Sequence, residues 1–153
     1  MYNELDLSDI KAKGWVRAFL QTQARGLTGE MGKVGEPFTE EYWGGPKDIV
    51  VGDDNFLGGL NSLNDAWVPF EQNGYWIDGM IRTARLIGDE GLLVQAKKKI
   101  YPAVENADED GYIGPAFLKD GMVWAHSVFF RALIAEYTAT KDQRILDALT
   151  KHY

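Results

Sequence analysis

The carboxylates near expected loop ends are the side chains of this sequence best suited to acid–base chemistry. Glu71 and Asp78 flank the start of an apolar stripe, and three consecutive acidic residues occupy positions 108–110. Cleavage of a glycosidic bond normally needs two carboxyl groups that flank the bond, roughly 5 to 9.5 Å apart. Glu71 is the best local candidate for an acid or for an acceptor of a sugar hydroxyl. Its alternative role is an N-terminal charge that favours the dipole of the following helix.

The acidic group at 108–111 superficially resembles a calcium-binding loop. Position twelve of such a loop, counted from Asp108, is Lys119 and not the glutamate that a calcium loop needs. We therefore predict a solvated turn. With two His and no Cys in the chain, we also expect no zinc site, and no Gly-rich segment has the spacing of a phosphate loop. The sequence predicts no metal and no cofactor within this chain.

Aromatic residues make up 12% of the chain, include five Trp, and gather around turn-rich segments. The flat face of an aromatic ring packs on the apolar C–H face of a sugar, whose hydroxyls stay free for hydrogen bonds. We therefore predict carbohydrate as the partner. The alternative for each Trp is a place in the hydrophobic core. The side chains considered for this surface are Trp43, Trp67, Gln72, Trp76, Asp78, Tyr112, Trp124 and His126.

His126 is the only histidine inside a segment with helical periodicity. An imidazole can donate to a hydroxyl or serve as acid or base near neutral pH, so His126 is a candidate contact for a sugar. The alternative is a histidine that lines the core or a hairpin with its hydrogen bonds satisfied. His152 lies at the end of the sequence, where we predict an exposed side chain.

Length and composition indicate one ordinary soluble globular domain of 153 residues, with 45% hydrophobic and 25% charged residues. The net charge of −7 argues against nonspecific binding to nucleic acid or anionic lipid. No stretch approaches the roughly 18 to 20 apolar residues that span a bilayer, and the start lacks a signal-peptide pattern. The absence of Cys excludes disulfides and a Cys nucleophile but leaves open a cytoplasmic or an exported location.

Helical spacing of apolar residues predicts a helix over 13–25, closed by a left-handed cap at Gly26, and two further helix pairs at about 70–101 and 123–153. Asp89 is predicted as an N-cap, and Pro102 is predicted to end or kink its helix. The segments 27–69 and 108–121 are rich in turn residues and are expected to be loops. Strand signals are nearly absent, the best lying at 48–52.

A repeat relates the two helix pairs. Shifting the sequence by 53 positions places Met80 on Leu133, Ile81 on Ile134 and Asp89 on Asp142. Apolar residues then meet apolar residues, and one cap meets the other, although chance agreement between two amphipathic hairpins is the alternative. The repeat predicts an all-α domain of stacked helical hairpins whose connecting loops share one rim. The last hairpin has nothing after it to cover its open side, so we expect self-association or a missing C-terminal part.

Five segments in order resemble the start of the β-L-arabinofuranosidase-like glycoside hydrolases, the group around glycoside hydrolase family 127. They are residues 10–15, 20–23, 26–29, 67–79 and 110–115. The resemblance implies an (α/α)6 toroid of helical hairpins with the sugar bound where the loops meet. In that family the catalytic carboxylate and the nucleophile, often a zinc-bound Cys, lie C-terminal to the matched region. The resemblance therefore implies that this chain supplies the front of an active-site cup without its chemical centre.

One site position is implied by the resemblance alone. His126 matches a family histidine that contacts the sugar, but the family commonly has Glu beside it, where this sequence has Ser127. We expect a glycoside hydrolase-like sugar-binding region in which the 153-residue chain by itself has little or no activity. The alternative is a non-catalytic hairpin module that binds a glycan or a protein on its aromatic rim.

Overall fold

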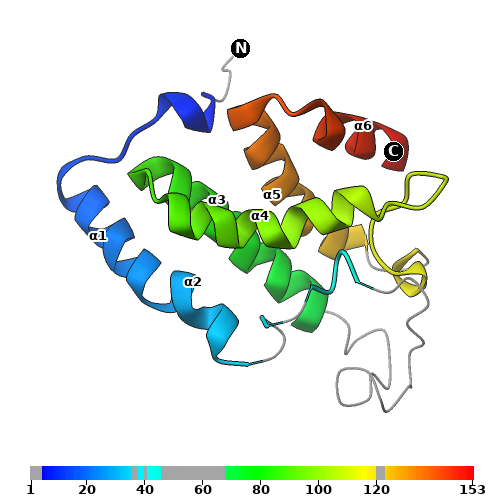
Figure 1. Ribbon diagram of the computed structural model, residues 1–153, viewed down its shortest axis with the longest axis horizontal. Helices are drawn as coiled ribbons and strands as arrows, with labels where there is room; N and C mark the ends of the chain where they lie inside the picture. The colour runs from blue at the N-terminus through cyan, green and yellow to red at the C-terminus, as the bar shows by residue number, and fades with distance from the viewer. Residues whose placement is uncertain (1–4, 36–37, 40, 46–67, 120–122) are drawn as a thin grey trace.

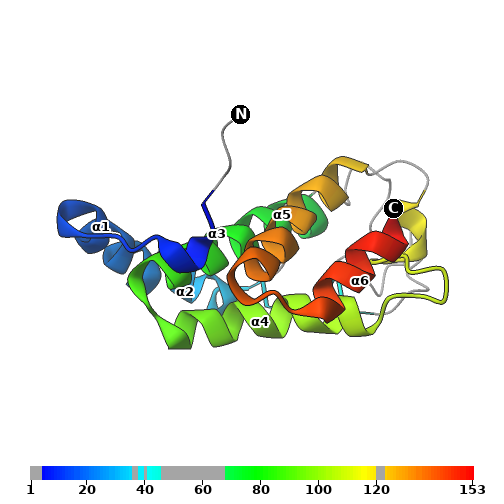
Figure 2. The same ribbon diagram turned by 90° about the horizontal axis from the view of Figure 1, so that it is seen from above.

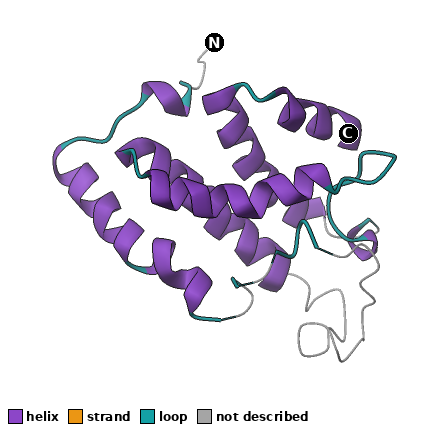
Figure 3. Ribbon diagram, in the orientation of Figure 1, coloured by secondary structure: helices purple, strands orange, loops and turns teal. Residues whose placement is uncertain are grey.

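The computed structural model describes residues 5–35, 38–39, 41–45, 68–119 and 123–153. All regular structure within these ranges is helical, and they contain no strand (Figure 3). The predicted all-α class is therefore confirmed. The expected strand at 48–52 and most of the loop predicted at 27–69 lie outside the described residues.

The N-terminal part of the chain forms helix α1 (Gly14–Arg25) and the short helix α2 (Leu27–Glu30), preceded and followed by the single turns η1 (Leu7–Asp9) and η2 (Met31–Lys33). The predicted first helix is confirmed. Its left-handed cap is wrong, because Gly26 has φ −102° and its N–H bonds back to carbonyls of the last turn. The chain continues directly into α2, so the loop expected from residue 27 begins as helix.

The first hairpin consists of α3 (Asn73–Ile87) and α4 (Glu90–Glu105), and the π-helical turn η3 (Val68–Gln72) leads into it. Gly88 closes α3 in the left-handed conformation with φ 72°. Asp89 then caps α4 as predicted, its carboxylate accepting the N–H of Leu92 at 3.0 Å. Pro102 does not end α4, which continues to Glu105 because buried Ala103 keeps the apolar face of the helix on the core.

The second hairpin consists of α5 (Val123–Thr140) and α6 (Gln143–His152), separated from α4 by a loop with the single turn η4 (Ala116–Leu118). Lys141 joins the two helices in the left-handed conformation with φ 56°. Asp142 caps α6 by accepting the N–H of Arg144 at 3.0 Å. Both predicted helix pairs are therefore present, each with an Asp cap at its turn.

The two hairpins pack side by side. Helix α3 lies against α5, and α4 lies against α6, so the four helices enclose one core (Figures 1 and 2). Helix α1 lies at the edge of the molecule against α3, tied there by the N–H of Ala12, which donates to the Leu86 carbonyl at 2.9 Å. The structure thus contains the two stacked hairpins that the repeat predicted.

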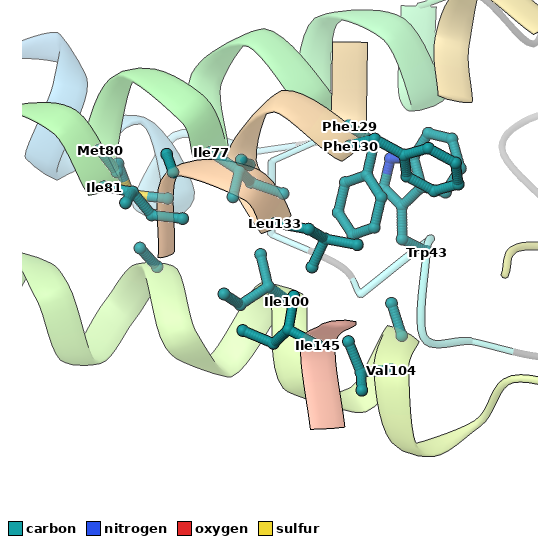
Figure 4. Close-up of a cluster of buried hydrophobic side chains, with 14 of the residues drawn as sticks. Trp43, Ile77, Met80, Ile81, Ile100, Val104, Phe129, Phe130, Leu133 and Ile145 are labelled. Carbon is teal, nitrogen blue, oxygen red and sulfur yellow. The ribbon is translucent and has the colours of Figure 1, made fainter. Parts of the chain in front are cut away.

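The hydrophobic core lies between the hairpins and takes side chains from α3, α4, α5 and α6 (Figure 4). Trp43 also enters it from a loop, stacking on Phe129 at 4.3 Å between ring centroids and donating its indole N–H to the Phe70 carbonyl at 3.2 Å. Trp43 is therefore a core residue. The labelled core side chains in Figure 4 are Trp43, Ile77, Met80, Ile81, Ile100, Val104, Phe129, Phe130, Leu133 and Ile145.

Residues that the repeat makes equivalent are buried alike at one pair of positions and differ in burial at another. Met80 and its equivalent Leu133 are both fully buried. Ile81 is fully buried as well, but its equivalent Ile134 is 49% exposed. Helix α3 packs on the helices α5, α4 and α1, whereas α5 packs on α3, α6 and the short turns η1 and η3, and this arrangement leaves Ile134 half-exposed. The first hairpin is the more enclosed of the two.

Candidate functional site

Several of the predicted site residues line a pocket of about 390 Å³ between α2, η2 and the start of the first hairpin. We call it the Glu71 pocket. Three of the predicted residues, Glu71, Gln72 and Trp76, line it together. Its full lining consists of Leu27, Thr28, Met31, Phe38, Glu71, Gln72, Tyr75 and Trp76.

Trp76 forms a fixed wall of the Glu71 pocket. Its indole N–H donates to the Thr28 carbonyl at 2.8 Å, and its ring meets Phe38 edge-on at 5.3 Å. The ring packs so closely on Gly32 that a Cβ there would come within 3.0 Å of it. Trp76 is therefore both a core residue and a pocket wall, which combines the two roles considered for it from the sequence.

Glu71 is half-buried at the edge of the pocket, where η3 leads into α3. Its Oε1 accepts the indole N–H of Trp124 at 2.8 Å. This bond joins η3 to the first turn of α5 and fixes the direction of the carboxylate. Trp124 itself is 61% exposed and is not a core residue. The carboxylate keeps further acceptor capacity, because an ionised carboxyl offers about four lone-pair sites.

Two aromatic residues outside the set predicted from the sequence also line the pocket. Tyr75 is 42% exposed at its mouth, and Phe38 forms part of its wall. Tyr75 could have been found, because it follows Glu71 by one helical turn and so shares its face. Phe38 comes from a separate segment of the chain, and no local sequence signal links it to Glu71.

The predicted residues Tyr112 and His126 lie together at a second, smaller pocket of about 110 Å³, which we call the His126 pocket. It is lined by Tyr112, Leu118, Lys119, Val123, His126, Ser127, Phe130, His152 and Tyr153. The rings of Tyr112 and His126 are 5.3 Å apart, and the Lys119 ammonium sits 4.7 Å above the Tyr112 ring. Five of the predicted residues therefore divide between the two pockets.

Two histidines hold the backbone of Ile113. His126 Nε2 is 2.9 Å from the Ile113 carbonyl oxygen. A carbonyl only accepts, so Nε2 carries the proton in this bond. His152 Nδ1 accepts the N–H of the same residue at 3.1 Å. The prediction that His152 is exposed is wrong, because this bond and the stacking of its ring on Tyr112 at 5.1 Å leave it half-buried.

Asp78 lies in neither pocket. It is buried, and its carboxylate forms ion pairs with Arg82 at 2.7 Å and with Arg131 at 3.0 Å. The second of these pairs connects α3 to α5. A buried carboxylate paired with two guanidinium groups serves packing between helices, since a buried charge without a partner is costly. Trp67, another predicted sugar contact, lies outside the described residues.

The acidic turn at 108–111 is held by its own neighbours. Asp108 accepts the N–H of Tyr112 at 2.7 Å with one oxygen, and the other oxygen pairs with Lys119 at 2.9 Å. Lys119, which stands where a calcium loop needs a glutamate, thus supplies the positive charge that pairs with Asp108. No group of three or more His, Cys, Asp or Glu side chains in the described ranges could hold a metal ion. In the same ranges, no helix has the length and apolar character to cross a membrane.

Strongly perturbed pKa values occur at the contact between α4 and α6. Burial, and then donation of its hydroxyl to Asp142 at 2.9 Å, raise the pKa of Tyr101 to about 12. The Arg144 guanidinium, 2.7 Å from Asp142, holds the pKa of that carboxyl well below its usual range. These groups line neither the Glu71 pocket nor the His126 pocket. Their role is to join the two hairpins.

Comparison with known proteins gives no further guide to this site. No family model matches the chain, and neither a curated protein nor a solved structure matches it. The resemblance to the β-L-arabinofuranosidase-like hydrolases therefore stays a prediction from the residues that suggested it.

Proposed function

We propose that the Glu71 pocket binds a carbohydrate ring and that the chain forms the sugar-binding front of a glycoside hydrolase-like site. The observation that carries this proposal is the lining of the pocket, which combines aromatic walls with one oriented carboxylate and one amide. Ligand pockets of this size typically have mostly apolar walls and a few placed polar groups. A sugar ring, with apolar C–H faces and hydroxyl edges, has matching chemistry.

Each pocket residue has a role that follows from its position. The exposed ring of Tyr75 offers a flat surface for the C–H face of the sugar. Gln72 can both donate to and accept from hydroxyls. Glu71 accepts a sugar hydroxyl while Trp124 holds its Oε1 in place. A hydrogen bond to a charged group contributes about 1.5 to 3 kcal/mol, so Glu71 is expected to dominate affinity.

Binding is better supported than hydrolysis by the described residues. Both retaining and inverting glycosidases use a pair of carboxyl groups, one on each side of the scissile bond. Among the described residues that line the pocket, Glu71 is the only carboxylate. This observation favours the second candidate function, a non-catalytic module that binds a glycan. In the glycosidase proposal, a part of the protein other than the described residues supplies the second carboxyl group.

Calorimetric titration with methyl α-L-arabinofuranoside and methyl β-D-xylopyranoside tests the binding proposal. We expect Glu71→Gln to weaken binding by roughly tenfold or more, because the charge-assisted hydrogen bond is lost. Tyr75→Ala should weaken it as well. The matched controls are Glu90→Gln, an exposed acid on α4, and Tyr153→Ala, an exposed ring on the rim of the His126 pocket. No binding of either sugar, or equal affinity for Glu71→Gln and wild type, would overturn the proposal.

Turnover tests whether this chain alone carries a complete hydrolytic site. An aryl arabinofuranoside releases its chromophore only if the glycosidic bond is cleaved. Sugar binding without turnover is the result expected both for the non-catalytic module and for the front of an incomplete glycosidase site, whereas turnover that is lost in Glu71→Gln and kept in Glu90→Gln supports a complete glycosidase.

A further inference from the structure

The polar and apolar side chains of the Glu71 pocket come from different parts of the chain. Glu71 and Gln72 both belong to the π-helical turn η3. The segment formed by α2 and η2, residues 27–33, instead contributes Leu27, Thr28 and Met31. A ligand whose hydroxyls bind Glu71 and Gln72 therefore has another part that faces the α2–η2 segment.

The side chains that the α2–η2 segment presents to the pocket are mainly apolar. The N–H of Met31 donates to the Leu27 carbonyl, so these two residues are one helical turn apart and share a face. The charged residues Glu30 and Lys33 pair with each other, Lys33 Nζ lying 2.8 Å from Glu30 Oε2, and neither lines the pocket. Thr28 is the one polar residue of this segment that lines it, and its carbonyl already accepts an indole N–H at 2.8 Å.

Phe38 extends the apolar wall that Leu27 and Met31 form. It is half-buried and meets the Trp76 ring edge-on, with ring centroids 5.3 Å apart. A hydroxyl that leaves water for such a wall loses hydrogen bonds, whereas a methyl group is stabilised by leaving water. The apolar wall therefore favours a ligand that carries an apolar group on the side away from Glu71.

We infer that the Glu71 pocket prefers a deoxy sugar, in which a methyl group replaces the exocyclic hydroxymethyl group, and that Leu27, Met31 and Phe38 determine this preference. The inference rests on the proposed sugar binding. The ring of the sugar lies on Tyr75, its hydroxyl edge meets Glu71, and its methyl group lies against the apolar wall. Solvent reaches this wall at Leu27, which is 69% exposed, so the expected preference is moderate, roughly five- to tenfold.

Calorimetric titration of the full chain with two matched pairs of sugars tests the preference. One pair is methyl α-L-arabinofuranoside and its 5-deoxy analogue, and the other is methyl β-D-glucopyranoside and its 6-deoxy analogue. In each pair that binds, the dissociation constant of the deoxy sugar should be roughly five- to tenfold lower. Equal affinities, or tighter binding of the hydroxylated sugar through the Thr28 hydroxyl, would overturn the inference. If none of the four sugars binds, the proposed function fails, and this inference fails with it.

Two near-isosteric substitutions test which residues set the preference. Leu27→Asn and Met31→Gln each place an amide in the apolar wall, so each should reduce the preference to about twofold or less by tightening the binding of the hydroxylated sugar. Leu5→Asn is the matched control, since Leu5 is 66% exposed and does not line the pocket, and it should keep the wild-type preference. Glu71→Gln should weaken both members of a pair and leave their ratio unchanged. A wild-type ratio in both Leu27→Asn and Met31→Gln would show that the wall does not select the methyl group.

Discussion

The two hairpins turn through the same backbone conformation with different residues. In each, a residue with positive φ follows the first helix and an extended Asp caps the second. Gly88 and Asp89 make the first turn, and Lys141 and Asp142 make the second. Glycine enters the left-handed region freely, whereas a residue with a Cβ does so at a cost of roughly 1 to 2 kcal/mol. The second turn thus repeats the left-handed conformation of the first, although it has Lys141 where the first turn has glycine.

The neighbours of each turn explain the difference. Lys141 donates to Asp6 at 2.8 Å and lies 5.8 Å above the ring of Tyr137. Asp142 accepts both from Arg144 and from the Tyr101 hydroxyl of α4, whereas the carboxylate of Asp89 accepts the Leu92 N–H of its own helix. The second turn is therefore bound to other parts of the molecule. The comparison teaches that local geometry is repeated while side-chain partners follow the packing.

Substitutions at equivalent apolar positions should give the largest difference between the hairpins in the free energy of unfolding. Ile81→Ala should lower the free energy of unfolding by about 2 to 5 kcal/mol, because it opens a cavity in the core. Ile134→Ala, at a half-exposed position, should cost about 1 kcal/mol or less. Urea denaturation followed by circular dichroism measures both. Met80→Ala and Leu133→Ala are the controls, since both side chains are fully buried. Equal losses for Ile81→Ala and Ile134→Ala would mean that the hairpins are equally enclosed.

The two Asp caps, Asp89 and Asp142, should differ by a smaller amount in what they contribute to the free energy of unfolding. Asp89→Ala removes one cap and should cost about 1 kcal/mol. Asp142→Ala removes a cap and also the acceptor of the Tyr101 hydroxyl, which should add about 1 kcal/mol. Tyr101→Phe in the Asp142→Ala background is the control, and it should recover part of the added cost. If Asp89→Ala is the more destabilising of the two, the bond between the hairpins contributes nothing.

The Asp142 cap also predicts a pH dependence. The pKa of Asp142 is held below its ordinary value of 3.8 in the folded chain, mainly by Arg144. The ionised form therefore stabilises the fold above this ordinary pKa, and the contribution is lost as pH falls toward the lower folded value. Asp142→Asn should be less stable than wild type at neutral pH, and the gap should close as the solution is acidified. A gap that stays constant down to the acid transition would contradict this assignment.

The smallest effects should come from exchanging the residues with positive φ. Gly88→Ala should cost about 1 kcal/mol, which is purely conformational because a Cβ there meets nothing within 4 Å. Lys141→Gly should have the opposite sign, a gain of about 0.5 kcal/mol, since relief of the backbone outweighs the exposed pair with Asp6. Thermal unfolding of both variants measures the signs. The same sign for both would show that Lys141 is stabilised by more than its backbone costs.

Much of the helical layout could be predicted from the sequence because capping and amphipathic spacing act over a few residues. Asp89 and Asp142 were found in this way, as were both hairpins. The errors occurred where distant packing decided the outcome. Ala103 keeps α4 helical past Pro102, and Ile134 is left half-exposed by the arrangement of its neighbours.

In the candidate site too, contacts between near neighbours could be predicted from the sequence and contacts between distant segments could not. Glu71, Gln72 and Trp76 could be predicted together, because they lie within about one and a half helical turns of each other. The bond from Trp124 to Glu71 joins residues 53 positions apart, and no local pattern specifies it. Phe38 reaches the pocket from another segment for the same reason. The sequence predicts Asp78 as a carboxylate near a loop end and a sugar contact, but its pairing with Arg131 of α5 shows a structural role.

The sequence by itself determined the all-α class, the two hairpins and their Asp caps, since these depend on hydrogen bonds and φ preferences between near neighbours. Only the tertiary structure decided which aromatic rings are core, as for Trp43, and which stay exposed, as for Trp15. It also decided that Glu71 and His126 line separate pockets. Burial depends on which helices meet, and an amphipathic pattern does not specify the neighbour that a given face will contact.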